Sequence, residues 1–321
     1  MNPEDQADFT TTPHVRHESI DEGSAGQRID NFLMRICKGV PKSHLYQILR
    51  SGQVRVNGKR ANQTYRLALG DAVRIPPIRL AQRDEKSVPL GKALEVVFED
   101  EAFLVLNKPP GKAVHGGSGV SFGVIEQLRA QRPDARFLEL VHRLDRETSG
   151  LLMVAKKRAA LCFLQDAMRQ NQVQKRYLTL VPGRWQNPLQ HIKLPLYKYE
   201  DAQGERRVRV SPEGKPSHSI VRLLGRYQGQ GQVFSLLEVE LKTGRTHQIR
   251  VHLAHHGFAL CGDDKYGDFA KNKLWQGMGL KRMFLHATWL SAPHPQTGES
   301  QVFQAALPAD LQGFLDHFEQ V

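Results

Sequence analysis

The chain has 321 residues, of which 40% are hydrophobic, and this is enough for a sizeable core and more than one domain. Its longest apolar runs, 151–155 and 159–164, are much shorter than the roughly 18 residues that a membrane span requires. Three widely spaced cysteines without a CxxC pair exclude a zinc ribbon and a disulfide framework. The N-terminal segment contains no apolar signal core, so we expect a soluble, cytoplasmic protein without membrane contact.

The charge of the chain is strongly basic and unevenly distributed. Forty-five Lys and Arg against 33 Asp and Glu give a net charge of +12, of which residues 1–25 contribute −5 and residues 26–76 contribute +8. Because Lys and Arg release counterions from a phosphate backbone, this surplus favours a polyanionic partner. The alternative is an ordinary solvated surface that keeps the protein soluble.

Residues 1–25 lack apolar periodicity and are expected to form a disordered tail. The spacing of apolar residues then predicts two short helices, one within 26–36 and one that opens at Ser43 as N-cap and closes at Gly52. Asn57-Gly58 predicts a hairpin turn between two strands. A small basic domain over 26–78 follows from this pattern, and the polar, aperiodic segment 79–93 is interpreted as a linker.

The remainder, residues 94–321, predicts a larger domain with a true core. Short strands are expected at 95–99 and 103–107, then a strand, a helix and a strand at 151–157, 158–170 and 173–183. Further strands are expected in "SHSIVRLLGRYQ", "VFSLLEVELKTG", "MFLHATWL" and "SQVFQAAL". This succession favours an α+β fold on a largely antiparallel mixed sheet.

Three segments of the larger domain combine charged, aromatic and apolar residues: "VHRLDRETSG" (141–150), "KRYLTL" (175–180) and "TGRTHQIRVHLAHHG" (243–257). In the first, Asp145 stands between Arg143 and Arg146 with apolar chain on either side. An arginine beside a buried acid keeps it ionised, and a fixed carboxylate can act as nucleophile or base. An ordinary ion pair that pins a loop to the sheet is an equally good interpretation.

Other chemistries are less well supported by these segments. Asp145 and Glu147 have the spacing of a glycosidase pair on a strand, but "RETSG" reads as a turn, and Glu147 is expected to pair with a neighbouring arginine. His252 and His256 are four residues apart on the predicted helix 243–257, without an HExxH motif or an acidic ligand, so no metal site is expected. The glycine cluster 114–123 lacks the features of a phosphate-binding loop and is interpreted as a mobile loop. A tyrosine at position 177 is most often a half-buried core residue.

Two resemblances organise these observations. The pattern "RIDNFL", "S..YQIL.SG.V.VNG" and "L..GD.V.I" resembles the S4-type RNA-binding domain. "HRLDRETSG", "KRYLTL" and "GRTHQIRVH", in this order behind such a domain, resemble the RluA-type family of RNA pseudouridine synthases over residues 26–315. The resemblance implies an enzyme that breaks the N1–C1′ bond of a uridine, rotates the uracil and joins C5 to C1′ without a metal or organic cofactor.

By motif, the resemblance assigns roles to individual residues. Asp145 matches the essential aspartate, Arg250 the arginine that pairs with it, and Tyr177 the tyrosine that packs on the uracil. Arg143 matches the residue that occupies the space left by the flipped nucleotide. Further substrate contacts are expected at His142, Arg146, Arg245 and Ile249, and phosphate contacts of the S4-type domain at Arg28, Lys42, Arg50, Arg55, Lys59 and Arg60.

The resulting hypothesis is an isomerase that converts specific uridines of 23S ribosomal RNA, or of its large-subunit precursor, to pseudouridine. An isomerase that keeps the leaving base needs no second carboxylate to activate water, in agreement with the single acid of the motif. A sister synthase with other target uridines, a catalytically silent ribosome-assembly factor and an RNA N-glycosidase are the alternatives. No nucleotide cofactor is expected, and the protein is expected to be a monomer.

Overall fold

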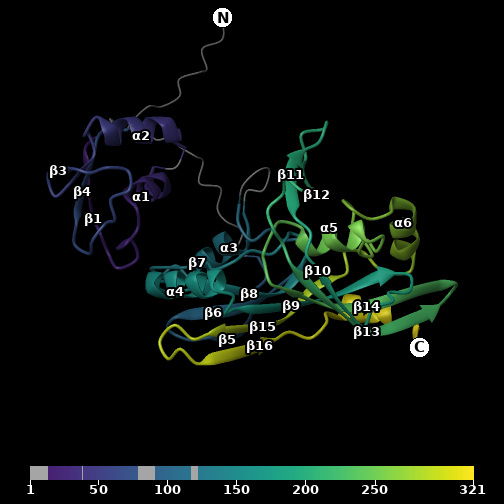
Figure 1. The fold of residues 1–321 in the computed structure, drawn as a ribbon. Coiled ribbons are helices and arrows are strands. Elements are labelled where there is room, and N and C mark those ends of the chain that lie inside the picture. The colour runs from purple at the N-terminus through teal and green to yellow at the C-terminus, as the bar shows by residue number, and fades with distance from the viewer. Residues whose placement is uncertain (1–13, 38, 79–90, 117–121) are drawn as a thin grey trace, which may run out of the picture. The chain divides into compact units, whose positions relative to one another are not determined.

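A computed structural model describes residues 14–37, 39–78, 91–116 and 122–321 of the chain. The chain divides into two compact units, residues 1–87 and residues 88–321, called here the N-terminal domain and the catalytic domain (Figure 1). Most of the expected linker 79–93 lies outside the described residues. No helix of the described residues is long and apolar enough to cross a membrane.

The N-terminal domain packs two helices on a four-stranded sheet of order β1-β4-β2-β3. Its elements are β1 (Arg16–Ser19), α1 (Ile29–Ile36), α2 (Lys42–Arg50), β2 (Arg55–Val56), β3 (Lys59–Arg60) and β4 (Ala72–Ile75). The apolar faces of both helices meet buried strand residues in one core. Asn57 and Gly58 join β2 to β3 with positive φ at both positions, 49° and 76°, as the hairpin prediction requires.

Two expectations for this domain are wrong. Residues 16–19 of the expected disordered tail form β1, which pairs with β4, and Ile20 is buried behind it. A short edge strand exposes most of its side chains, so its sequence carries no apolar alternation. Ser43 does not cap α2: the helix begins at Lys42 after Pro41, whose fixed φ suits a helix entry. Residues 1–13 lie outside the described residues.

The catalytic domain contains one large sheet, a separate two-stranded hairpin and five helices among its described residues. Its elements are β5 (Glu95–Glu99), β6 (Phe103–Lys108), α3 (Val124–Gln131), β7 (Glu139–Leu140), β8 (Ser149–Ala155), α4 (Arg158–Arg169), β9 (Gln174–Pro182), β10 (Leu189–Ile192), β11 (Leu196–Glu200), β12 (Arg206–Val210), β13 (Ser219–Gly229), β14 (Gln232–Leu241), α5 (Gln248–His255), α6 (Phe269–Gly277), β15 (Leu285–Pro293), β16 (Ser300–Gln304), α7 (Ala309–Leu315) and β17 (Glu319–Gln320).

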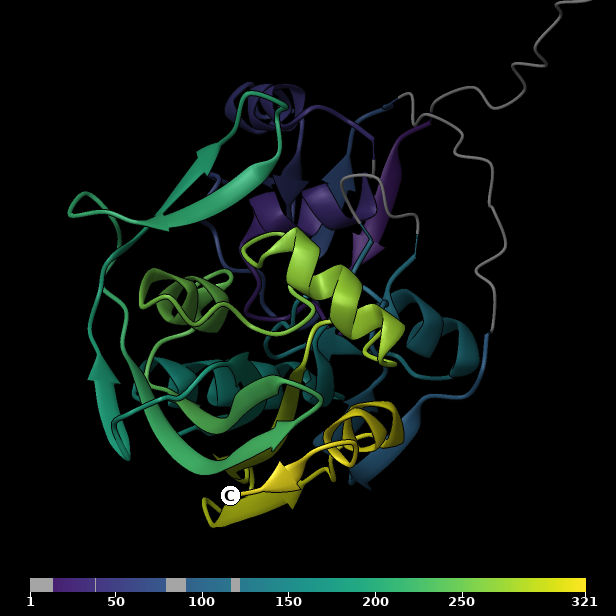
Figure 2. The same cartoon turned by 90° about the vertical axis from the view of Figure 1, so that its right-hand side faces the viewer.

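The main path of the large sheet runs β10-β13-β14-β9-β15-β8-β6-β5, and its neighbours are antiparallel except for the parallel pair of β15 with β8. The expected α+β class with a largely antiparallel mixed sheet is confirmed. Residues 149–155 of β8 are buried along the whole strand because helices cover both faces of this part of the sheet. Figure 2 shows the β11–β12 hairpin standing apart from the large sheet of the catalytic domain.

Side chains of β6 alternate between two hydrophobic cores on opposite faces of the sheet. Leu104 and Leu106 pack in the core that contains α3 and α5, whereas Phe103 and Val105 pack in the core that contains α4. The first core includes Tyr177 of β9. The first core therefore packs α5 on the part of the sheet where β8 begins beside β15 and Tyr177 of β9, and the candidate site lies there.

Candidate active site

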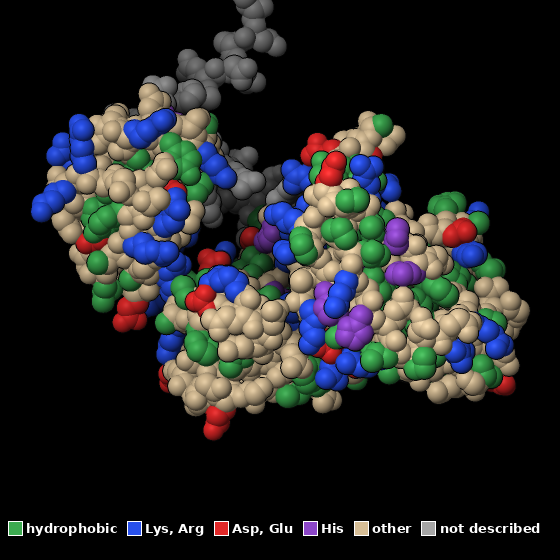
Figure 3. Space-filling view, in the orientation of Figure 1, with side chains coloured by type: hydrophobic (Ala, Val, Ile, Leu, Met, Phe, Trp, Pro, Cys, Tyr) green, Lys and Arg blue, Asp and Glu red, His purple; other side chains and the backbone are tan. Residues whose placement is uncertain are grey.

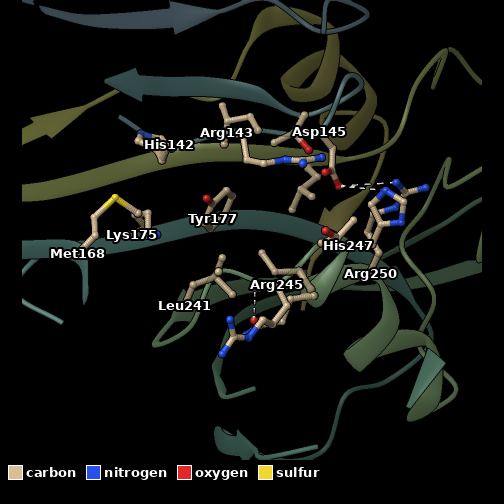
Figure 4. A pocket seen from close by; sticks show the side chains of 17 residues that line it. His142, Arg143, Asp145, Met168, Lys175, Tyr177, Leu241, Arg245, His247 and Arg250 are labelled. Carbon is tan, nitrogen blue, oxygen red and sulfur yellow. Dashed lines mark hydrogen bonds and ion pairs between the residues drawn. The ribbon is translucent and has the colours of Figure 1, made fainter. Parts of the chain in front are cut away.

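A cavity of about 220 Å³ is lined by residues from all three of the segments 141–150, 175–180 and 243–257. Its walls come from the loop between β7 and β8, from α4, from the start of β9, from the turn between β14 and α5, and from β15. The charged residues of its lining are one acid, Asp145, and the four bases Arg143, Lys175, Arg245 and Arg250. Figure 4 shows Tyr177 between a group formed by Met168, Lys175 and His142 and a group formed by Asp145, His247 and Arg250.

Asp145 and Arg250 form the charged centre of the cavity. Arg250 Nη1 lies 3.7 Å from Asp145 Oδ2, and the same guanidinium donates two hydrogen bonds of 2.7 Å from Nε and Nη2 to Asp263. Asp263 is fully buried, and the backbone N–H groups of Lys265 and Tyr266 also donate to it. Burial alone would raise the pKa of Asp263, but the guanidinium and these donors hold it below its ordinary value. Asp263 thereby fixes the arginine that faces Asp145.

The sequence neighbours of Asp145 do not form its ion pair. Among the described residues, Arg250 is the only Lys or Arg with a nitrogen within 4.0 Å of the Asp145 carboxylate. Arg146 is exposed and pairs with Glu147, as expected for Glu147, and Arg143 is exposed at the rim of the cavity. The structure thus brings Asp145 together with Arg250, the arginine that the resemblance pairs with it, whereas the adjacent Arg143 and Arg146 lie exposed.

A buried lysine and a glycine hold the Asp145 loop in place. Lys108 is fully buried and donates to the carbonyl oxygens of Pro109 (2.7 Å), Lys112 (2.9 Å) and Arg146 (3.1 Å). Burial lowers the pKa of Lys108 to about 7. Gly150 has a φ of +108°, and a Cβ there would collide with the backbone of β15. The glycine of "TSG" therefore allows β8 to pack closely against β15, directly behind the loop.

His247 is a further neighbour of Asp145 that the sequence analysis did not select. Its Nε2 lies 3.9 Å from Asp145 Oδ2, and its Nδ1 lies 2.8 Å from the Tyr266 hydroxyl. The hydroxyl accepts a hydrogen bond from the Val208 N–H at 3.0 Å, so its single proton is free to donate to Nδ1. Burial lowers the pKa of His247, although the charge of Asp145 opposes this shift. The tautomer in which Nδ1 accepts from the Tyr266 hydroxyl has its proton on Nε2, the nitrogen that faces Asp145.

Tyr177 is both a core residue and a cavity residue. It is only 6% exposed, it packs among apolar side chains of the sheet and α5, and it lines the cavity. Burial and the charge of Asp145 raise the pKa of Tyr177 well above its ordinary value, so the phenol keeps its proton at neutral pH. A buried neutral ring at this place can support a flat ligand.

His142 and Arg245 have backbone partners on two sides of the cavity. Met153 N–H donates to His142 Nε2 at 3.1 Å, and burial followed by the charge of Lys175 lowers the pKa of His142 to about 3. Arg245 is bound through Nε to Pro216 O at 3.2 Å. Ile249 is buried at the start of α5, beneath the cavity.

The helix of the third segment begins later than expected. α5 begins at Gln248, with His247 as its N-cap in the left-handed region at φ 53°, and neither Thr243 nor Thr246 caps it. Thr243 instead donates its hydroxyl proton to the Gln248 side chain at 2.7 Å. Gly257, with φ +82°, follows the helix as expected. The strained N-cap directs His247 toward Asp145 instead of continuing the helix.

The histidines at positions 252 and 256 are structural. His252 is fully buried between the hydroxyls of Ser217 (2.9 Å) and Ser219 (3.0 Å), and burial lowers its pKa to about 4. His256 lies edge-on to Trp185. The described residues contain no cluster of three or more His, Cys, Asp or Glu that could hold a metal ion. Half of the glycine cluster 114–123, residues 117–121, lies outside the described residues.

Five of the six basic residues selected in the N-terminal domain are exposed: Lys42, Arg50, Arg55, Lys59 and Arg60. Figure 3 shows Lys and Arg side chains spread over the visible face of this domain. Arg28 differs, because its guanidinium donates to Asp30 at 2.6 and 3.1 Å beside the start of α1. Arg28 therefore has a structural partner and is less available to a phosphate than the other five.

Comparisons with known proteins agree with this site. The family model of RNA pseudouridylate synthases matches residues 102–255, and the S4 domain model matches residues 27–73. The chain is 50% identical to ribosomal large subunit pseudouridine synthase C of Salmonella typhi over 96% of this chain and 98% of that one, and 51% identical to the protein of that name from Escherichia coli (strain K12) over 94% and 96%. The chain belongs to the RNA pseudouridylate synthase family.

A solved structure of this family supports the same fold. Human RNA pseudouridylate synthase domain containing 1 matches with a TM-score of 0.60 and 26% identity, over 71% of this chain and 89% of that chain. The predicted family is thus confirmed. Within the family, "GVPKS", "VRIPP", "AVHGGSG.SFGVIE" and "RPDARFLELVHRLDR" predict a likeness to the bacterial large-subunit synthase C, and the high identities confirm that likeness.

Several residues of this synthase site were missed by sequence reasoning. His247 and Lys175 stand inside the selected segments, next to residues that were chosen, and their type alone gave no reason to prefer them. Asp263 and Tyr266 belong to "CGDDKYGD", a segment without a recognised pattern. They reach the site only because the chain after α5 returns beneath Arg250.

Proposed function

We propose that this chain isomerises specific uridines of 23S ribosomal RNA to pseudouridine, a proposal supported by its likeness to proteins named ribosomal large subunit pseudouridine synthase C. The observation that carries the proposal is the cavity with a single carboxylate: Asp145 faces a guanidinium that Asp263 fixes, and a buried tyrosine lies alongside. A sugar hydrolase needs a second carboxylate to activate water, and none lines the described cavity.

In this mechanism the target uridine leaves the RNA stack and enters the cavity with its ribose toward Asp145 and its base against Tyr177. The Asp145 carboxylate, which faces Arg250, either attacks C1′ or removes the C2′ proton, and the N1–C1′ bond breaks with its electron pair passing to the uracil. The uracil rotates in place, and C5 bonds to C1′ as the Asp145 oxygen leaves C1′ or as Asp145 returns the proton to C2′. C5 then loses its proton and N1 gains one, so the product is an isomer of the substrate. Arg143 at the rim is suited to fill the space that the flipped nucleotide leaves.

Exposed cations of the N-terminal domain supply the affinity for RNA in this proposal. Lys42, Arg50, Arg55, Lys59 and Arg60 are all on its surface, where they can reach phosphates without burying a charge. Phosphate contacts of this kind offset the free energy of unstacking the target base. We infer that the protein works as a monomer, in the cytoplasm and without a cofactor.

The test is a comparison of wild type with Asp145→Asn on unmodified 23S rRNA transcript. Pseudouridine is mapped by carbodiimide-dependent stops of reverse transcription, and free uracil is measured in the same reactions. We expect stops with wild type, no stops with Asp145→Asn, and no uracil from either. Asp134→Asn, an identical change at an exposed position, serves as the control and should retain full activity. Tight RNA binding without stops would support an assembly factor, and release of uracil would support an N-glycosidase.

A further inference from the structure

Lys175 is a cavity residue to which the mechanism above assigns no role. It precedes Tyr177 by two positions on β9, so both side chains leave the same face of the strand about 7 Å apart. Figure 4 shows it next to Met168, on the opposite side of Tyr177 from Asp145 and Arg250. Its ammonium lies close to Gly244, at the entrance to the turn before α5: a Cβ at Gly244 would be 3.7 Å from Lys175 Nζ.

This ammonium has no partner within the described residues: no carboxylate lies within ion-pair distance, and no hydrogen bond joins it to another group. Arg176, the next residue of the same strand, does have partners: its guanidinium stacks on the Trp289 ring at 4.3 Å and faces Glu238. The side chain of Lys175 is half-buried, and a cation that loses part of its hydration without gaining a partner lowers stability. The expected compensation is a ligand that brings an acceptor to this place.

The charged and titratable groups around Lys175 do not supply that acceptor. The β7–β8 loop contributes His142, Arg143 and Asp145, the turn before α5 contributes Arg245, and β9 contributes Tyr177. Asp145 belongs to the other side of Tyr177, His142 is neutral and Tyr177 keeps its proton. Desolvation lowers the pKa of Lys175 to about 8, so the ammonium form still predominates at neutral pH.

The proposed uridine places an acceptor on that side. In the proposed pose, C1′ lies at Asp145 and the uracil ring packs against Tyr177. The ring atom opposite N1 is C4, and its carbonyl oxygen O4 points away from the sugar. Rotation that puts C5 in the position of N1 exchanges C4 with C2, so O2 then occupies the place of O4. A donor on the far side of Tyr177 therefore meets a carbonyl oxygen both before and after the rotation.

We propose that Lys175 donates a hydrogen bond to the uracil carbonyl that lies opposite the sugar, and that this bond strengthens as the N1–C1′ bond breaks. This inference rests on the proposed function and adds a catalytic residue to it. When the electron pair of the N1–C1′ bond passes to the uracil, negative charge spreads from N1 onto O2 and O4. A fixed ammonium in a site with little water stabilises such charge, and Lys175 keeps its protons throughout.

The test measures binding and chemistry separately in the full-length protein. Lys175→Met removes the donor at similar size, and Lys175→Gln keeps a neutral donor. At saturating 23S rRNA transcript, we expect the single-turnover rate to fall about 100-fold with Met and about tenfold with Gln. The Kd for the RNA and its dependence on salt should stay within twofold of wild type. Lys157→Met, at an exposed position paired with Glu101, should match wild type in every measurement.

Two further readouts distinguish a chemical role from a structural one. The wild-type rate should decline above about pH 8 as the ammonium loses its proton, and this decline should be absent in Lys175→Met. Unfolding in urea should show the Met variant to be at least as stable as wild type, because an unpartnered cation is removed. If Lys175→Met does not fold, Lys175→Gln provides the same comparison of RNA binding with the single-turnover rate.

Other outcomes would overturn the proposal. A roughly tenfold weaker Kd with a salt slope lower by about 0.7, at an unchanged single-turnover rate, would show that Lys175 binds a phosphate instead. Unchanged binding and unchanged rate would show that it does not contact the substrate. In both cases wild type still forms pseudouridine, so these results are distinct from a failure of the proposed function, in which wild type forms none.

Discussion

Charged residues of the N-terminal domain and of the cavity differ in how they are held. Arg55, Lys59 and Arg60 lie exposed on a hairpin of the N-terminal domain, whereas Arg250 and Asp263 are buried and joined by two short hydrogen bonds. Exposed charges act through their number and are screened by salt. Buried charges depend on one partner at one distance, and loss of that partner leaves the other uncompensated. Buried and exposed charges should therefore respond differently to substitution, pH and salt.

The largest expected effect is that of Asp263→Asn. The change keeps the shape of the side chain but leaves the buried Arg250 guanidinium without its carboxylate, so we expect a loss of about 3–5 kcal/mol in the free energy of unfolding. Because Arg250 is then no longer fixed opposite Asp145, the single-turnover rate should fall about 100-fold. Urea unfolding and rapid-quench kinetics measure the two effects.

Asp166→Asn is the matched control for that change. Asp166 also pairs with an arginine, Arg169, but both side chains are more than half exposed. We expect a loss below about 1 kcal/mol and no change in rate. Equal losses for the two variants would contradict the distinction between buried and exposed pairs.

The second prediction concerns pH. Burial lowers the pKa of His142 to about 3 and those of His252 and His286 to about 4, whereas an unfolded histidine titrates near 6.5. Between pH 6.5 and pH 4 the unfolded chain therefore binds more protons than the folded catalytic domain, so stability is fully present above pH 6.5 and is lost as the pH falls. Each histidine should contribute a loss of about 1–2 kcal/mol by pH 5.

The described histidines of the N-terminal domain, His14, His17 and His44, are all exposed. Hydrogen exchange of the intact protein, followed by mass spectrometry of peptides from each domain, should show faster exchange in the catalytic domain at pH 5 than at pH 7 after correction for the intrinsic rates. Equal acceleration in both domains would argue against the buried histidines as the cause.

The third prediction addresses the exposed cations. Simultaneous replacement of Arg55, Lys59 and Arg60 by Gln should weaken RNA binding about tenfold at moderate salt and reduce the slope of log Kd against log salt by about 2. The rate at saturating RNA should not change, because these side chains are on the N-terminal domain surface and outside the cavity lining. Lys157→Gln is the single-site control, and a loss of rate in the triple variant would contradict separate roles for the two regions.

The smallest expected effect is that of metal removal. Among the residues that the structure describes, no group of His, Cys, Asp or Glu is arranged for a metal ion, and the charged chemistry of the cavity comes from Asp145 and the surrounding bases. Treatment of the protein with a chelator selective for transition metals, followed by assay on prefolded RNA, should leave activity unchanged. A loss that zinc restores would contradict this.

The family, the α+β class, most strands and the three segments of the cavity were predictable from the sequence. These features depend on patterns that are local in the chain: apolar alternation, helical spacing, the Asn57-Gly58 turn and contiguous motifs. The strand β1 was missed because an edge strand buries few side chains, and the N-caps of α2 and α5 were misplaced because a cap is decided by backbone geometry at single residues.

Only the tertiary structure decided how these charges are held. The resemblance pairs Asp145 with Arg250, more than 100 residues later, but neither the exclusion of the adjacent Arg143 and Arg146 from this pair nor the anchoring of Arg250 by Asp263 could be predicted from the sequence. The physical reason is that three features of the fold determine the distances between these charges, and sequence separation encodes none of them. These features are the direction of side chains in the turn, the packing of α5 on the sheet and the return of the chain beneath α5. For the same reason Lys175 became a candidate only when the cavity showed its ammonium without a partner.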